Sequence, residues 1–274
     1  METTRTSLAV GAGLAYASLF LAGCGGAPRH TLRSEPGAAS TPHRAAPLEI
    51  PKHGATRPAC RVEAAVRATR TRSFAALVRT GAAILTGPNG GQVLARVDRT
   101  DRNGYPTVLG IVGAEANAGA CAPLAYRVQL PVPPNGRSGW ISADAVRVFG
   151  VESRIVVDLS ERRLVAYRGG EPVLTVRVAI GSPRTPTPVG RYFVNERWLL
   201  ANGDGPFGIA ALGISAHSEV LRDWVQGGPI ALHGTNEPAT IGQAVSHGCV
   251  RLSNADMQRL LPLAPAGTPV VIRR

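Results

Sequence analysis

The stretch Ile230-Ala231-Leu232-His233-Gly234-Thr235, followed by Ser246-His247-Gly248-Cys249-Val250-Arg251, is the most informative part of the chain. These two short stretches together contain a thiol, two imidazoles and two glycines. A thiol is a poor nucleophile while it is protonated, and a nearby imidazole is the usual group that removes its proton. A glycine beside the thiol lets a substrate carbonyl approach the backbone N–H groups closely, as an oxyanion site requires. The pattern predicts that Cys249 is a catalytic nucleophile.

The complete string HGTNEPATIGQAVSHGCVRL, in which His233 precedes Cys249 by sixteen residues, closely resembles the signature of the L,D-transpeptidases. These are cysteine enzymes that cross-link bacterial peptidoglycan. The resemblance extends from Arg154 to Ile272 and includes RIVVDLSERRLVAYRGG, TPTPVGRYFV and GPFGIAALGISAHSEVL. It implies a mainly β catalytic domain over residues 153–273, a β-sandwich with small helices.

The resemblance also implies a role for each residue of the motif. Cys249 is the nucleophile, and the first histidine, His233, is the general acid and base. No acidic residue occupies an obvious triad position, so we expect the backbone carbonyl of Gly234 to orient His233. The backbone N–H groups of Gly248 and Cys249 are the expected oxyanion donors. The expected substrate-binding residues are Ser246, His247 and Arg251, although many family members carry Asn at the position of Arg251.

The implied reaction is attack on the carbonyl of the third residue, a diamino acid, of a peptidoglycan tetrapeptide stem. Terminal D-Ala leaves, a thioester forms on Cys249, and a neighbouring stem amine resolves it to a 3→3 cross-link. Carbapenem β-lactams are expected to trap the thiol, and the chemistry requires no cofactor. If water resolves the thioester, the site is a carboxypeptidase or endopeptidase. A wall-binding lipoprotein with a degenerate site is a further alternative, and a zinc site formed by His217, His233, His247 and Cys249 is another.

The N-terminus predicts export. Arg5 precedes an apolar run of 13 residues, Leu8 to Phe20, which is too short to span a bilayer and suits a signal peptide. Leu21-Ala22-Gly23-Cys24 resembles the lipobox of bacterial lipoproteins. We therefore expect a lipoprotein signal peptide over residues 1–23, lipidation of Cys24 and an anchor at the outer face of the cytoplasmic membrane. Ordinary secretory cleavage near Ala27 is the alternative.

Residues 24–58 are rich in Pro, Ala, Gly and Ser and show no apolar periodicity, which predicts a disordered tether. Beyond it, Cys60 and Cys121 are left without an assigned role, and an oxidising compartment favours a disulfide between them. Two buried free thiols are the alternative.

Residues 59–149 predict a small separate β-barrel, because short apolar runs alternate with turn signals. The segment YRVQLPVPPNGRSGWISADAV resembles the end of bacterial Src-homology-3-like domains. Trp140 is interpreted as a core residue, with a wall-ligand platform as the alternative. Part of residues 61–78 could be helical, although the pattern is ambiguous.

Within residues 153–273 we expect mostly strands. Three prolines force a loop over residues 183–190 because proline cannot donate to a strand ladder. Residues 218–225 suggest a short helix. Ser253-Asn254-Ala255-Asp256 is a capping signal for another helix, and residues 268–272 suggest a final strand.

The formal charge of +12 does not by itself indicate a nucleic-acid partner. Residues 1–150 carry 17 basic against 8 acidic residues, whereas residues 151–274 carry 13 against 10. The excess is scattered, only 5% of residues are aromatic, and neither half contains a basic helix with interleaved aromatics. Attraction to an anionic cell envelope explains the charge at least as well. The expected partners are peptidoglycan stems and the membrane.

Overall fold

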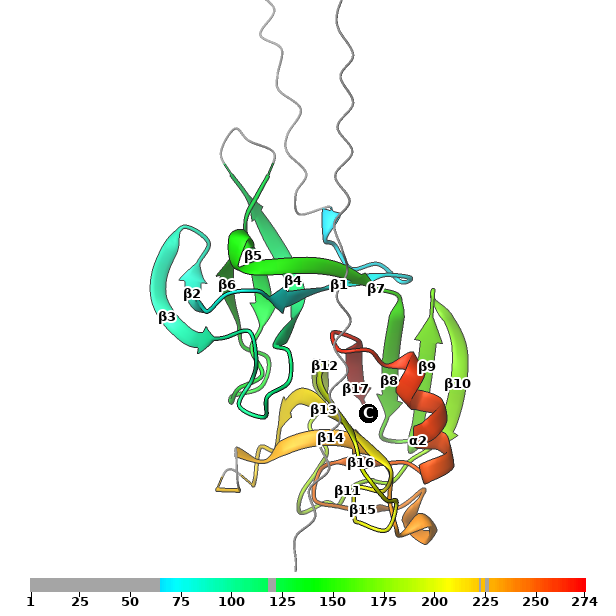
Figure 1. Ribbon diagram of the computed structural model, residues 1–274. Helices are drawn as coiled ribbons and strands as arrows, with labels where there is room; N and C mark the ends of the chain where they lie inside the picture. The colour runs from blue at the N-terminus through cyan, green and yellow to red at the C-terminus, as the bar shows by residue number, and fades with distance from the viewer. Residues whose placement is uncertain (1–64, 118–121, 222, 225–226) are drawn as a thin grey trace, which may run out of the picture. The chain divides into compact units, whose positions relative to one another are not determined.

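The computed structural model describes residues 65–117, 122–221, 223–224 and 227–274, which belong to one compact unit (Figure 1). The signal peptide, the lipidation of Cys24, the tether and the Cys60–Cys121 disulfide lie outside these residues and stay predictions. No helix in the described part of the chain is long and apolar enough to cross a membrane. The prediction of a mainly β chain is confirmed.

The N-terminal sheet has seven antiparallel strands in the order β3-β2-β6-β5-β4-β1-β7. Buried side chains such as Ile84, Leu109 and Ile141 form its core. Trp140 is half-buried and lies opposite Leu85 and Arg127 on the neighbouring strands. The likeness to Src-homology-3 domains stays a prediction. The strands are β1 (Ser73–Val78), β2 (Ala82–Gly87), β3 (Gly90–Val97), β4 (Val108–Ala116), β5 (Pro123–Gln129), β6 (Ser138–Ser142) and β7 (Val146–Val151).

The ambiguous pattern of residues 61–78 ends in a strand. Residues 73–78 form β1, which pairs with β4 on one side and β7 on the other. Just before it, the hydroxyl of Thr69 accepts hydrogen bonds from the backbone N–H groups of Thr71 and Arg72. Such a local bond stabilises a turn and competes with a helix.

The C-terminal sheet has eight strands in the order β10-β9-β8-β17-β12-β13-β14-β16. The first part of β12 pairs with β17 and the rest pairs with β13, with a register shift between Val194 and Glu196. A shift of this kind bends a strand, and the two halves of the sheet share one apolar core. The strands are β8 (Ser153–Asp158), β9 (Arg163–Arg168), β10 (Glu171–Arg177), β12 (Gly190–Leu199), β13 (Ala210–His217), β14 (Pro229–His233), β16 (Val250–Arg251) and β17 (Pro269–Arg273).

Several local predictions for this part are confirmed. Residues 182–189 form a loop, β17 is the final strand, and α2 (Asn254–Leu260) begins after Ser253. The hydroxyl of Ser253 accepts a hydrogen bond from the backbone N–H of Asp256, as the capping signal predicts. Met257 and Leu260 anchor this helix in the core.

The expected helix at residues 218–225 is not found among the residues described there. Residues 218–221, 223 and 224 form bends and a turn. The hydroxyl of Ser218 accepts hydrogen bonds from the backbone of Val220 and Leu221, and Gly227 and Gly228 have positive φ. These local contacts offer the backbone an alternative to the helix.

Candidate active site

Two neighbouring strands carry the predicted nucleophile and base. β14 and β16 run parallel, and their register places Leu232 opposite Val250 and His233 opposite Arg251. Cys249 directly precedes β16, and its Sγ accepts a hydrogen bond from the backbone N–H of Ala231 at 3.4 Å. Because side chains alternate along a strand, Ala231 and His233 lie on the same face of β14. His233 is the last residue of β14.

The imidazole of His233 is buried and oriented by the backbone. Its Nδ1 lies 2.6 Å from the carbonyl oxygen of Gly234. A carbonyl oxygen only accepts hydrogen bonds, so Nδ1 carries the proton and Nε2 of the neutral ring is the free base. Burial lowers the pKa of His233 to about 4, partly offset by the Gly234 bond. The ring is therefore neutral at pH 7.

The thiol is also neutral at rest. Burial raises the pKa of Cys249, and the Ala231 hydrogen bond and the positive charge of Arg251 oppose that shift. The same Arg251 charge helps to lower the pKa of His233. The site therefore holds a protonated thiol and a neutral imidazole rather than a thiolate–imidazolium pair. A protonated thiol beside a neutral imidazole reacts by giving its proton to the imidazole while the sulfur attacks the substrate.

Gly248 and Ser246 form the turn that presents the thiol. Gly248 has a φ of 118°, which only glycine adopts readily, and a Cβ there would meet Ile230 Cδ1 at 2.9 Å. The N–H of Gly248 donates to the hydroxyl of Ser246 at 3.1 Å, and that hydroxyl donates to the carbonyl of Cys249 at 2.6 Å. The N–H of Gly248 is thus bound inside the turn, which differs from the expected free oxyanion donor. Ser246 is buried and holds the turn.

The other two predicted substrate-binding residues, His247 and Arg251, have different surroundings. His247 is exposed, with its ring centroid 5.4 Å from that of Trp224, and the turn at Gly248 separates it from Cys249. Nη1 of Arg251 forms an ion pair with Oε2 of Glu237 at 2.7 Å, so an internal carboxylate already binds the guanidinium. The described residues contain no cluster of three or more His, Cys, Asp or Glu side chains able to hold a metal. The zinc alternative gains no geometric support.

Asn254 and Phe207 lie outside residues 233–251 and contact them directly, and neither was predicted from the sequence as a site residue. Oδ1 of Asn254 accepts hydrogen bonds from the backbone N–H groups of Ile209 and Thr235, at 3.3 and 3.1 Å, and so ties two loops beside His233. The ring of Phe207 packs edge-on against His233, with centroids 4.8 Å apart. The only sequence signal for Asn254 is that it follows the motif closely, three residues after Arg251. Its contact with Ile209 cannot be predicted locally, because the two residues are 45 positions apart.

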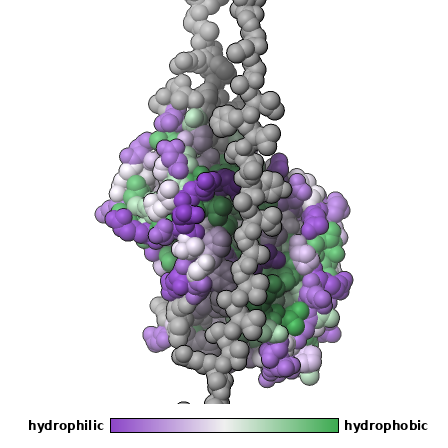
Figure 2. Space-filling model, in the orientation of Figure 1, coloured by the Kyte–Doolittle hydropathy of each residue, from purple (hydrophilic) through white to green (hydrophobic). Residues whose placement is uncertain are grey.

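A cavity of about 700 Å³ opens beside the thiol. Its walls are mostly apolar and include Cys249, Ala231, Phe207, Trp198 and Trp224. On the face shown in Figure 2, hydrophilic residues dominate the outline and apolar residues appear between them in small groups. A concave apolar site with a nucleophile in its wall is the usual form of a binding site for a covalent substrate.

Comparison with known proteins concerns mainly the C-terminal half of the chain. The family model of the L,D-transpeptidase catalytic domain, YkuD, matches residues 152–272. The chain is 37% identical over 150 residues to YkuD of Bacillus licheniformis, covering 52% of this chain and 83% of that protein. It is 32% identical over 151 residues to YkuD of Bacillus subtilis, covering 53% and 84%. A crystal structure of an Enterococcus faecium L,D-transpeptidase mutant aligns with a TM-score of 0.35 and 24% identity, over 44% of this chain and 49% of that one. The two sequence relatives, each covered over more than four-fifths of its length, establish that the chain belongs to the L,D-transpeptidase family.

Proposed function

We propose that this chain is an exported, lipid-anchored cysteine L,D-transpeptidase that joins peptidoglycan stems by 3→3 cross-links. The observation that carries the proposal is the pairing of β14 with β16, which sets a thiol beside a strand whose neutral imidazole has its Nε2 free. Membership of the family supports the same reaction. The proposed lipid anchor is Cys24, in the segment that resembles a lipobox.

In the first half-reaction, Sγ of Cys249 attacks the carbonyl carbon of the third stem residue while its proton passes to Nε2 of His233. The bond to the terminal D-Ala then breaks, and that amine leaves with the proton from Nε2. The carbonyl of Gly234 holds the ring in the required tautomer and stabilises the imidazolium that forms in between. A thioester remains on Cys249.

In the second half-reaction, the side-chain amine of a neighbouring stem attacks the thioester and gives its proton to His233. The amide forms and the thiol is restored by the returning proton. The backbone N–H of Cys249 is the proposed oxyanion donor. The N–H of Gly248 joins it only if the Ser246 hydroxyl gives up the hydrogen bond that it now accepts.

The test is to incubate the full chain, purified in detergent, with a disaccharide tetrapeptide, beside its Cys249→Ala variant. Mass spectrometry should find a cross-linked dimer that has lost one D-Ala with the parent protein and none with the variant. Loss of D-Ala without dimer would instead make the protein a carboxypeptidase. Equal products from both proteins would overturn the thiol mechanism.

A second test traps the thiol directly. A carbapenem should acylate Cys249 and add its mass to the protein, and the Cys249→Ala variant should stay unmodified. An unmodified parent protein would contradict the proposed nucleophile. Iodoacetamide labelling of the same sample serves as the control that the thiol is reduced.

A further inference from the structure

A groove of about 420 Å³ lies on the face of the C-terminal sheet that is turned away from its apolar core. In β8, Ile155 and Val157 pack in that core, whereas the alternate residues Arg154 and Val156 line the groove. Side chains alternate along a strand, so the groove belongs to the opposite face of the sheet. We call it the arginine groove. The basic residues that line it are Arg70, Arg72, Arg154, Arg191 and Arg273.

The arginine groove carries an excess of positive charge. Its lining contains five arginines and a single acidic residue, Glu152. Of these arginines only Arg273 forms an ion pair with a described residue, through its Nε and Oδ2 of Asp158, which are 3.2 Å apart. The other four guanidinium groups have no carboxylate partner among the described residues. Uncompensated guanidinium groups in one groove attract anions.

Arg154 differs from an ordinary solvated arginine. It lies opposite Tyr167 of β9, and its Cζ is 4.6 Å from the centroid of that ring. Its Nε is buried and has no hydrogen-bond partner among the described residues. Stacking on the ring fixes the plane of the guanidinium and leaves its N–H edge free. A buried donor without a partner is uncommon, so it indicates that a ligand supplies the acceptor.

A turn just before β1 contributes Arg70 and Arg72. Oγ1 of Thr69 accepts hydrogen bonds from the backbone N–H groups of Thr71 and Arg72, at 3.3 and 3.0 Å. The N–H of Thr69 donates to the carbonyl of Arg72 at 2.7 Å. The turn also packs on Gly170, where a Cβ would meet Cγ2 of Thr71 at 3.2 Å. The backbone that carries both arginines is therefore ordered in advance, which lowers the entropy cost of binding a ligand.

The spacing of the sheet arginines suits a polymer. Val156 of β8 lies opposite Val271 of β17, which lies opposite Arg191 of β12. Arg154 is two residues from Val156, so two strand spacings and two residues separate the backbones of Arg154 and Arg191, about 12 Å in all. Two charged units of one chain fit this separation better than a single small ion does.

The directions of the arginines favour phosphate over carboxylate. Because some belong to the turn and others to the sheet, their guanidinium groups reach a ligand from different sides. A tetrahedral phosphate accepts hydrogen bonds from several sides, whereas a planar carboxylate accepts best within its plane. Tyr167 is the only aromatic residue among the described residues of the lining, and Arg154 already covers one face of its ring. The lining therefore suits a phosphate chain without stacked bases.

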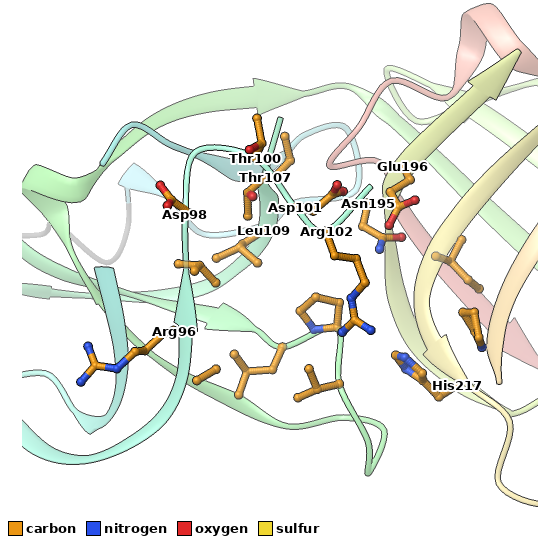
Figure 3. A pocket seen from close by; sticks show the side chains of 18 residues that line it. Arg96, Asp98, Thr100, Asp101, Arg102, Thr107, Leu109, Asn195, Glu196 and His217 are labelled. Atoms are coloured by element: carbon orange, nitrogen blue, oxygen red, sulfur yellow. The ribbon is translucent and has the colours of Figure 1, made fainter. Parts of the chain in front are cut away.

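The arginine groove is distinct from the active site. Figure 3 shows another cavity, of about 380 Å³, where the segment after β3 meets β12 and β13. That cavity carries both signs of charge, as with Asp101 and Arg102, and shares four lining residues with the cavity beside the thiol. The described residues that line the arginine groove belong to neither of these cavities. A polymer bound in the groove would leave the thiol accessible.

We propose that the arginine groove binds an anionic polymer whose charges are phosphate diesters, and that this contact holds the protein on the cell envelope. Arg154 and Arg191 bind neighbouring phosphates from the sheet, and Arg70 and Arg72 bind from the turn. The inference does not depend on the proposed function, because the groove shares no described residue with the thiol cavity.

The experiment measures binding of a fluorescent glycerol phosphate oligomer to the full chain in detergent by anisotropy. The variants are Arg154→Gln and Arg191→Gln. The matched control is Arg168→Gln, an exposed arginine of β9 that lies outside the groove and whose Nη2 donates to the carbonyl of Pro262 at 3.4 Å. Each variant should weaken binding about fivefold, and the control should bind as the parent does. Binding should also weaken as NaCl is raised.

Equal binding of the oligomer by all four proteins, or no binding by the parent, would overturn the inference. Three competitors test the ligand class. Polyglutamate of the same charge should compete at least about tenfold less well, and equal competition would overturn the choice of phosphate. Single-stranded DNA that binds more tightly than the oligomer would replace it with a nucleic acid. Vesicles of phosphatidylglycerol, compared with neutral phosphatidylcholine, would replace it with a membrane surface if they alone bind in an Arg154-dependent way.

Two readouts separate a failure of the groove from other failures. An unchanged midpoint of thermal unfolding shows that each variant is folded. D-Ala release from a tetrapeptide should be the same in all four proteins, because the thiol site is untouched. Loss of oligomer binding with normal release would support the inference, whereas a parent protein that binds the oligomer without releasing D-Ala would leave the inference standing and overturn only the proposed function.

Discussion

The guanidinium of Arg251 and the carboxylate of Glu237 form an ion pair beside the thiol, with Nη1 and Oε2 2.7 Å apart. The Arg251 side chain is 17% exposed and that of Glu237 is 61% exposed. The charge of Arg251 lowers the pKa of both Cys249 and His233. Glu237 therefore sets how much positive charge the two reacting groups experience.

We expect Glu237→Gln to leave Arg251 uncompensated and to lower the pKa of the Cys249 thiol. The rate of iodoacetamide alkylation, followed from pH 6 to 10, should then rise at a lower pH than in the parent protein. Arg251→Gln should move the same profile to higher pH, because it removes the charge that opposes the effect of burial. Profiles that shift in the same direction in both variants would contradict this electrostatic role.

The buried His233 makes folding stability depend on pH. Its pKa is lowered to about 4, so as pH falls from about 6.5 to 4 the unfolded chain binds the proton and the folded chain does not. Above about pH 6.5 the ring is neutral in both the folded and the unfolded chain, so it does not affect the free energy of unfolding there. This free energy should decrease by up to about 3 kcal/mol as pH falls from about 6.5 to 4. His233→Gln should lose less stability over that range in urea unfolding. His217 titrates in the same direction in both proteins, so the difference isolates His233.

Asn254 is the first residue of the short helix α2, and we expect its loss to slow catalysis. Asn254→Ala removes the acceptor that ties Ile209 and Thr235 together, and we expect about a tenfold slower carbapenem acylation from a displaced His233 loop. The matched control is Ser253→Ala, which removes the adjacent helix cap and should cost about 1 kcal/mol of stability without slowing acylation. Equal acylation rates in both variants would show that Asn254 acts only on stability.

The features that sequence reasoning predicted are those specified by local chemistry. The capping residues of α2 lie within four positions of one another, and the prolines after Gly181 exclude a strand by themselves. His233 directly follows the apolar run Ile230-Ala231-Leu232 and is the last residue of β14. The Gly234 carbonyl contact is found because the two residues are adjacent in the chain.

The features that were missed depend on segments distant in sequence. Phe207 contacts His233 from a loop that precedes it by 26 residues, and Arg251 meets Glu237 across a loop. No local pattern specifies these pairs. Residues 73–78 form a strand that pairs with β4 on one side and β7 on the other, whereas the local pattern of residues 61–78 is ambiguous. Tertiary pairing overrides propensity there.

Phe193 is the strongest case of such long-range packing. It belongs to β12 of the C-terminal sheet, yet it is 1% exposed and packs in the core of the N-terminal sheet, where a Cβ at Gly110 would meet its Cδ1 at 2.9 Å. The next residue, Val194, packs in the other core. We expect Phe193→Ala to cost about 3–5 kcal/mol, because a cavity forms where two sheets meet. Hydrogen exchange should accelerate first in β4 and β5, whereas Val194→Ala should accelerate exchange in β13 and β17. The same exchange pattern from both variants would mean that the two cores unfold together. It would contradict the expectation that Phe193 stabilises the N-terminal core selectively.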